Sequence, residues 1–277
     1  MVDPFGVSLI VLFGVSVFTW VASLATGNSS WVDRSWSITP ILYVGVFAGS
    51  AGFRHTTLTV MFVLVTLWGA RLTFNFWRKG GYQRGGEDYR WPILRDRMSG
   101  WQYQVFNLVF IVVFQNVLLW LISLPALVVL EAPETAFGPA QLSLTVAFLA
   151  LLALETAADQ QQWNFHQRKA RMIEQGQHPS PRFLDEGLFK YSRHPNFFAE
   201  QAQWWVFWGF GAVALGTLAH WSVIAPLLLS ALFWGSTRFT EAITREKYPE
   251  YANYQARTSA IVPWIPRRES RTSGLTA

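Results

Sequence analysis

The stretch YQVFNLVFIVVFQNVLLWLISLPALVV, residues 103–129, contains no aspartate, glutamate, lysine or arginine. An α-helix needs about 20 consecutive apolar residues to cross the hydrocarbon core of a bilayer, and this run exceeds that length. Its few polar residues are uncharged amides and hydroxyls, which a membrane helix tolerates when they face another helix. The run therefore predicts a transmembrane helix.

Comparable apolar runs lie on both sides of this stretch. They predict further spans at residues 5–26, 38–53, 57–77, 139–160, 197–217 and 219–238. Only 14% of the residues are charged, against about 25% in an ordinary soluble domain. The predicted fold class is an all-α integral membrane protein, a bundle of seven transmembrane helices.

The basic residues are distributed unevenly among the connecting segments. With the N-terminus outside, the loops at 78–102 and 161–196 and the tail after 239 share one side and carry most of the lysines and arginines, whereas the other side receives only Arg54. Cytoplasmic loops carry such an excess. We therefore expect the N-terminus outside and the C-terminus in the cytoplasm, in a bacterial inner membrane.

Several functional classes are excluded by composition. The chain has no cysteine, which rules out disulfides, thiolate metal sites and a cysteine nucleophile. The scattered histidines predict no metal site. The net charge of +5 lies in loops beside apolar runs, where topology explains it without nucleic acid. Gly209 and Gly211 fall inside an apolar run, so they do not form a dinucleotide-binding glycine loop.

Five ionisable residues in or near the predicted spans require an explanation: Arg71, Glu155, Asp159, Glu200 and Glu241. A charge at the centre of a membrane helix costs about 2.5–3.5 kcal/mol on insertion scales. Internal ion pairs or side chains that reach the interface would account for any one of them. A purely structural bundle could dispense with all five, so the set predicts a functional site.

The clearest local motif is GLFKYSRHPNFFAE, residues 187–200. Pro195 favours the first turn of a helix, where its missing N–H costs nothing. The basic residues just before it would then lie at a helix N-terminus, which attracts phosphate. Asn196 and Glu200 would share one face of the helix. The alternative is a basic membrane boundary followed by a capped helix, and the local residues leave both interpretations open.

From Glu155 to Pro263 the sequence resembles the C-terminal domain of the steroid 5α-reductases and their bacterial relatives. The resemblance rests on the Gly-Leu-Phe-x-Tyr run at 187–191, on Asn196 with Glu200 and Trp204, and on the end at 248–263. The tripeptide at 193–195 is also shared with isoprenylcysteine carboxyl methyltransferases and related membrane methyltransferases.

This resemblance implies a seven-helix fold that holds NADPH between its helices and under cytoplasmic loops. Asp159, Arg182, Asn196 and Glu200 match cofactor-facing positions of the family, and Arg71 resembles an arginine of its third helix. The full set of cofactor-binding residues that we expect is Arg71, Arg84, Tyr89, Asp159, His166, Arg182, Tyr191, His194, Asn196, Glu200, Trp204, Arg245 and Tyr248. Arginine suits phosphate because its guanidinium donates two parallel hydrogen bonds.

In the N-terminal half the sequence departs from the family. The family places Gln-Glu on the second helix and tyrosine on the third, where this chain has Val32-Asp33 and Trp68. We predict Asp33 and Tyr43 as the catalytic residues in their place. The expected domain, residues 1–266, divides into a substrate side at 1–130 and a cofactor side at 139–266, with a disordered tail at 267–277.

The expected reaction is NADPH-dependent reduction of the Δ4 double bond of a 3-oxo-Δ4-steroid or a similar lipophilic enone. The substrate would enter from the bilayer, and membrane lipid is the other expected partner; no obligate protein partner is expected. Two alternatives stay open. One is a membrane methyltransferase that uses S-adenosylmethionine on a lipid or prenylated substrate; the other is a non-catalytic sterol-binding protein.

Overall fold

The computed structural model describes residues 3–267. It is all-helical, with 74% of residues in helices and no strand among the described residues. The predicted tail 267–277 lies outside the described residues apart from Arg267. The helices are α1 Pro4–Thr26, α2 Trp31–Trp36, α3 Thr39–Ser50, α4 Thr56–Arg78, α5 Arg90–Asp96, α6 Gly100–Phe106, η1 Asn107–Phe114, α7 Gln115–Ser123, α8 Pro125–Glu131, α9 Pro139–Glu174, η2 Gly187–Lys190, α10 Pro195–Leu215, η3 Trp221–Val223, α11 Ile224–Lys247 and α12 Tyr251–Arg257.

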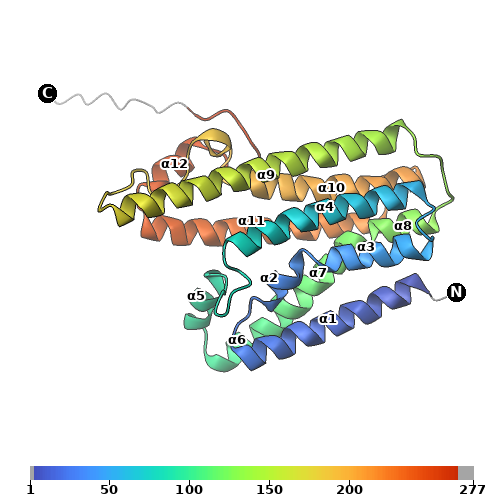
Figure 1. Cartoon of the computed structure of the whole chain (residues 1–277), viewed down its shortest axis with the longest axis horizontal. Coiled ribbons are helices and arrows are strands. Elements are labelled where there is room, and N and C mark those ends of the chain that lie inside the picture. The colour runs from blue at the N-terminus through green and yellow to red at the C-terminus, as the bar shows by residue number, and fades with distance from the viewer. Residues whose placement is uncertain (1–2, 268–277) are drawn as a thin grey trace. The chain divides into compact units, whose positions relative to one another are not determined.

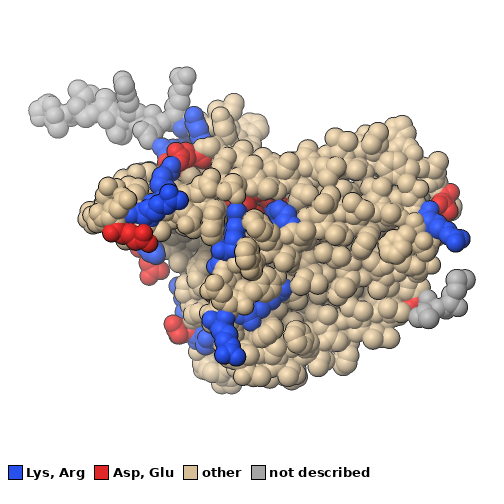
Figure 2. All heavy atoms as spheres, viewed as in Figure 1, with Lys and Arg blue, Asp and Glu red and all other residues tan. Residues whose placement is uncertain are grey.

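Helices occupy all seven predicted span positions. Among the described residues, five are long and apolar enough to cross a membrane: Pro4–Thr26, Thr56–Arg78, Gly100–Glu131, Pro139–Glu174 and Trp221–Lys247. Figure 2 shows broad areas of surface without a charged side chain, as lipid contact requires. The described chain is thus all-helical, and its several long apolar helices are consistent with a membrane protein; the count of seven spans and the orientation stay predictions.

The two remaining positions differ from a simple span for separate reasons. Helix α3 has 12 residues, and at about 1.5 Å per residue it is too short to cross a core of about 30 Å. Helix α10 has 21 residues but carries Asn196, Glu200, Gln201 and Gln203. Helix α9 continues to Glu174, beyond the predicted end of the span at 160, because residues 161–174 contain no glycine or proline and several good helix formers, among them glutamine and arginine.

The chain forms two compact units. Unit 1 consists of residues 1–150 and 203–230, and unit 2 of residues 151–202 and 231–277. Unit 1 therefore contains α1 to α8, and unit 2 contains η2 and α12. Helices α9, α10 and α11 each contribute residues to both units.

In unit 1, α1 runs beside the long helix built from α6, η1 and α7 (Figure 1). Lipid does not drive two apolar helices together, so close packing and hydrogen bonds between helices must stabilise the pair. Three such bonds join Trp120 Nε1 to Ser8 Oγ (2.9 Å), Asn116 Nδ2 to Thr19 Oγ1 (3.1 Å) and Asn107 Nδ2 to Ser23 Oγ (2.8 Å). This ladder explains why the quoted stretch keeps two asparagines.

In unit 2, the segment after α12 returns to the start of α10. Ser192 forms a parallel bridge with Ser259, and its Oγ donates to the carbonyl oxygen of Ile261 at 2.6 Å. The backbone N–H of Trp264 donates to the carbonyl oxygen of Tyr191 at 2.9 Å. These bonds hold residues 258–264 alongside residues 190–193.

Gly187 opens the Gly-Leu-Phe-x-Tyr run, and the backbone conformation at this position favours glycine. Its φ is +62°, and an added Cβ would lie 2.5 Å from Gln161 Oε1, the atom that accepts from the Leu188 N–H at 2.9 Å. We expect Gly187→Ala to lower the free energy of unfolding by about 1–3 kcal/mol, because an L side chain is strained at this φ. Thermal unfolding of the detergent-purified protein measures the change.

Gly176→Ala is the matched control for this prediction. Gly176 also has a positive φ, +71°, but its Cβ would meet open space. Its substitution should therefore cost the backbone strain alone and lower the melting temperature less than Gly187→Ala does. Equal losses for the two variants would contradict a role for the contact with Gln161.

Candidate functional site

In unit 2, helices α9 and α10 carry buried acids, and a hydrogen bond joins the two helices beside them. Asp159 and Glu155, one turn apart on α9, are each 3% exposed, and Glu200 on α10 is 5% exposed. Asn196 Nδ2 donates to Asp159 Oδ1 at 3.4 Å. Residues four apart share a helix face, so these four side chains form one strip, which we name the acidic seam. Buried carboxylates are costly unless they are paired or hydrogen-bonded, and clusters of them are candidates for a functional site.

The start of α10 is occupied by an ion pair rather than an open cationic site. Arg193 Nε and Nη2 donate to the two oxygens of Glu241 at 2.6 and 2.9 Å, and both side chains are less than 10% exposed. His194 Nε2 lies 3.0 Å from Glu241 Oε1, and Gln255 Nε2 donates to Glu241 Oε2 at 2.9 Å. The charge of Arg193 is thus already compensated within the protein, and His194 is oriented by the same carboxylate.

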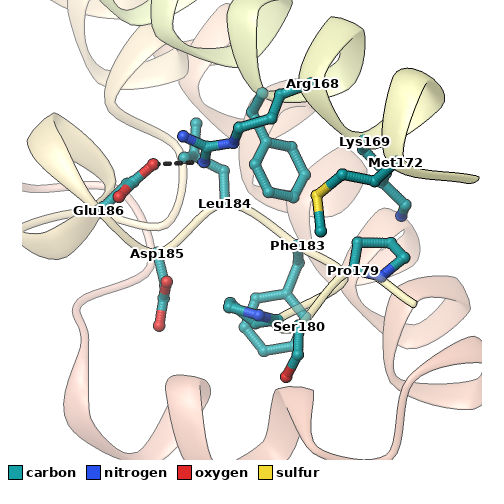
Figure 3. A pocket seen from close by; sticks show the side chains of 11 residues that line it. Arg168, Lys169, Met172, Pro179, Ser180, Phe183, Leu184, Asp185 and Glu186 are labelled. Atoms are coloured by element: carbon teal, nitrogen blue, oxygen red, sulfur yellow. Dashed lines mark hydrogen bonds and ion pairs between the residues drawn. The ribbon is translucent and has the colours of Figure 1, made fainter. Parts of the chain in front are cut away.

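A small cavity lies under the loop between α9 and η2 in unit 2 (Figure 3). Its volume is about 140 Å³, and its lining mixes aromatic with charged side chains. Arg168 on α9 forms an ion pair of 2.6 Å with Glu186, and Phe183 lies on the opposite wall. Ligand pockets for whole small molecules measure about 300–1,000 Å³, so this cavity accommodates a fragment of one.

Beside this cavity lies a cationic cluster of Lys169, Arg182 and Tyr248, which we name the loop cluster. Lys169 Nζ donates to Tyr248 Oη at 3.1 Å and to the carbonyl oxygen of Arg182 at 2.6 Å. The Arg182 guanidinium carbon is 5.9 Å from the centre of the Tyr248 ring. Burial opposes ionisation of the phenol, but the hydrogen bond and charge of Lys169 outweigh it and lower the pKa of Tyr248.

In unit 1, α2 places Asp33 against the start of α5. Trp91 Nε1 donates to Asp33 Oδ2 at 2.8 Å. Arg90 is bound to Asp88 at 2.8 Å, and the Asp88 N–H donates to Ser30 Oγ at 2.8 Å. Burial, followed by the negative charge of Asp88, raises the pKa of Asp33, although Arg90 and Trp91 act in the opposite direction. Asp33 therefore keeps its proton to a higher pH than an exposed aspartate.

The apolar support for this site comes from a π-helix. Val32 and Trp91 are buried in one cluster with Ile111 and Val112, which belong to the π-helix η1. π-Helical turns are rare and occur often at functional sites. The π-helix thus lies directly under the residues that position Asp33.

Tyr43 on α3 is fully buried, and its hydroxyl has no hydrogen-bond partner among the described residues. The Oγ1 atom of Thr39, one turn earlier on the same face, likewise has none there. An unsatisfied buried hydroxyl costs about 1–3 kcal/mol. A ligand that presents a polar group to this face would satisfy both hydroxyls. No hydrogen bond joins Tyr43 to Asp33 within the described residues.

The remaining predicted site residues are dispersed. Arg71 is half-buried in α4, and Trp204 packs edge-on against Trp68 with ring centres 4.9 Å apart in unit 1. The exposed ones are Arg84, Tyr89, His166, Tyr191 and Arg245. The structure thus joins Asp159 to Asn196 and Arg182 to Tyr248.

Sequence reasoning missed three residues of these clusters. Trp91, Lys169 and Thr39 were not predicted, although each contacts or neighbours a predicted site residue. Thr39 lies one turn from Tyr43, and helical periodicity was a signal that could have found it. Trp91 and Lys169 lie 58 and 79 residues from their partners, and no local pattern connects them.

The comparisons with known proteins place the chain in a family. Residues 19–258 match the family model described as "Protein of unknown function (DUF1295)". An uncharacterized protein of Schizosaccharomyces pombe is 39% identical over 279 residues, covering 94% of this chain and 80% of the relative. No solved structure matches the chain. Neither description names an activity, and the matched region extends across every candidate residue from Asp33 to Tyr248. The chain belongs to the DUF1295 family.

Proposed function

We propose that this protein is a membrane-bound oxidoreductase that reduces a lipophilic α,β-unsaturated ketone, such as a 3-oxo-Δ4-steroid, with NADPH. The observation that carries the proposal is the buried Tyr43 hydroxyl, which lacks a partner among the described residues. A phenol in this state is suited to donate to a substrate carbonyl. The proposal assigns polarisation of the substrate to unit 1 and cofactor binding to unit 2.

The side chains of unit 2 fit the chemistry of a dinucleotide. NADPH would supply the hydride. The loop cluster offers two cations and an aromatic face, which suit phosphate and a base. The acidic seam offers an amide and carboxylates away from water, which can accept from and orient a carboxamide. The cavity of about 140 Å³ fits only a fragment, so the proposal assigns to it a single ring.

The residues of unit 1 would act on the substrate. The Tyr43 hydroxyl would donate to the carbonyl oxygen and stabilise negative charge as it develops there, and Thr39 would donate beside it. Asp33, whose pKa is raised by burial and by Asp88, would hold a proton to a higher pH than an exposed aspartate and could donate it. Buried aromatic and aliphatic side chains around α3 would keep water out.

Activity that depends on protonated Asp33 is expected to fall as the pH rises. A carboxyl donates only in its protonated form, and burial with Asp88 shifts its deprotonation upward. Turnover should therefore be maximal at pH values below the raised pKa of Asp33 and should be lost at pH values above it. The measurement is kcat/KM against pH for the wild type and Asp33→Asn, whose amide does not titrate. If kcat/KM of Asp33→Asn still falls at high pH as it does in the wild type, Asp33 does not have this role. The same conclusion follows if the fall at high pH disappears in the exposed control Asp96→Asn.

The first test of the proposal is cofactor binding to the detergent-purified protein, measured by calorimetry with NADPH, NADP+ and S-adenosylmethionine. Saturable binding of NADPH is expected, with Arg182→Ala and Glu200→Ala each weakening it roughly tenfold or more, the scale of one charge-assisted hydrogen bond. Arg171→Ala is the matched control, because Arg171 is an exposed arginine near the end of α9 that does not belong to the loop cluster or the acidic seam.

The other outcomes lead to different functions. Binding of S-adenosylmethionine alone would overturn the reductase and favour a membrane methyltransferase. Binding of neither cofactor, together with retention of sterol, would favour a sterol-binding protein. Where NADPH binds, its oxidation in the presence of 3-oxo-Δ4-steroids tests the substrate class.

The proposal includes seven spans in a bacterial inner membrane, with the N-terminus outside and the C-terminus in the cytoplasm. The excess of basic residues in alternate loops supports it. Because the chain has no cysteine, a single introduced cysteine reports its own side of the membrane. Cysteine at position 54 should react with an impermeant maleimide in intact cells, and cysteine at position 171 only after lysis. The reverse pattern would overturn the orientation.

A further inference from the structure

The segment after α12 exposes apolar side chains although its backbone is held in place. Val262, Trp264 and Ile265 are 59%, 72% and 78% exposed. Two backbone hydrogen bonds fix this segment, from the Trp264 N–H to the Tyr191 carbonyl and from the Arg267 N–H to the Arg257 carbonyl, each 2.9 Å long. A fixed row of exposed tryptophan, isoleucine and valine marks an interaction surface.

A basic cavity lies directly beside this row. Its volume is about 310 Å³, and Arg193, Arg257 and Arg267 line it together with Trp264 and Ile265. No acidic side chain lines it among the described residues. Arg193 is compensated by Glu241 and Arg257 pairs with Asp185, whereas Arg267 is exposed and brings a further positive charge. The lining therefore favours an anion.

The level of this cavity relative to the membrane follows from α11. Arg193 binds Glu241, which lies six residues before the end of the candidate span Trp221–Lys247. On the same helix, exposed Trp234 stacks with Arg238, whose guanidinium carbon is 4.5 Å from the ring centre. Tryptophan and arginine concentrate at the membrane–water interface. The cavity thus lies near the end of a membrane span, where lipid headgroups are found.

We propose that this cavity, formed by residues 255–267 and Arg193, binds the headgroup of an anionic phospholipid. The arginine side chains would bind the phosphate, since guanidinium matches phosphate with two parallel hydrogen bonds. Trp264 and Ile265 would contact the glycerol and the first acyl carbons. The combination of cations with fixed exposed apolar groups favours a lipid over a soluble anion, which would leave the apolar row in water. This site is separate from the loop cluster and does not depend on the proposed reductase activity.

Native mass spectrometry of the full chain with phosphatidylglycerol and phosphatidylcholine tests the site. The wild type should retain phosphatidylglycerol preferentially, and Arg257→Gln with Arg267→Gln should lower that affinity roughly tenfold or more, as expected for the loss of two interfacial charges. Arg267→Gln alone should lower it by several-fold. The Arg267 side chain is exposed, and an exposed substitution changes stability little, so this variant should leave the fold intact. Arg171→Gln, an exposed arginine elsewhere in unit 2, is the matched control and should have no effect.

A second measurement tests insertion of the apolar row. With cysteine introduced only at position 265 and spin-labelled in bilayers that contain phosphatidylglycerol, the label should be more accessible to oxygen than to a water-soluble nickel complex. A label in water would overturn the proposal, as would phosphatidylglycerol affinity that Arg267→Gln and the double variant leave unchanged. Inorganic phosphate that displaces the lipid at equal concentration would also overturn it, in favour of a soluble anion.

Discussion

Replacing Glu241 with glutamine is expected to lower the free energy of unfolding by about 3–5 kcal/mol, the cost of leaving one partner of a buried ion pair without the other. Glu241 accepts from Arg193 through both oxygens and also from Gln255. Glutamine has nearly the same shape, so the loss reports charge rather than packing. Arg193 also donates to the carbonyl oxygens of Gln255 and Thr258. If Arg193 moves when Glu241 loses its charge, these two hydrogen bonds weaken, and the whole segment after α12 should loosen.

The measurement is thermal or denaturant unfolding in detergent. Glu246→Gln is the matched control: Glu246 lies on the same helix and is exposed, and exposed substitutions change stability by less than about 0.5 kcal/mol. The double variant Arg193→Met with Glu241→Met removes both charges and should cost less than the sum of its two single substitutions. If Glu241→Gln unfolds no earlier than Glu246→Gln, the pair does not stabilise the fold.

Replacing Tyr43 with phenylalanine is expected to reduce turnover about 10²–10³-fold while stability does not fall. The first effect rests on the proposed function, in which the phenol donates to the substrate carbonyl; removing one such donor has this magnitude in other enzymes. The second rests on the structure. The Tyr43 hydroxyl is buried without a partner among the described residues, so its removal deletes an unsatisfied polar group and leaves the ring packed.

Tyr103→Phe is the matched control for this prediction. Tyr103 is also buried in unit 1, but its hydroxyl lies 2.7 Å from Ser29 Oγ. Its removal should cost about 1 kcal/mol of stability, a typical net hydrogen bond, and leave turnover unchanged. Enone reduction and thermal unfolding are measured on both variants. Full activity in Tyr43→Phe would exclude the phenol as the donor, and a lower melting temperature would mean that the hydroxyl already has a partner.

The positions of the helices were predictable because they depend on local composition. A helix is found in each predicted apolar run. Helix α10 begins at Pro195 as expected, since the fixed φ of proline suits the first turn. The positions where helices end were harder to predict. The predicted span 139–160 lies within α9, but the first part of the loop expected at 161–196 is helical as far as Glu174, because hydropathy gives no signal in that polar stretch.

The partners of the polar side chains were decided by tertiary structure alone. Asn196 and Glu200 were predicted as neighbours from their spacing, but the role of Arg193 depends on Glu241, which is 48 residues away. Asp33 likewise depends on Trp91, and the missing partner of Tyr43 is visible only in the folded unit. Spacing along one helix is set by its period of 3.6 residues. A contact between helices depends on how they pack, and a single sequence does not contain that information in any local pattern.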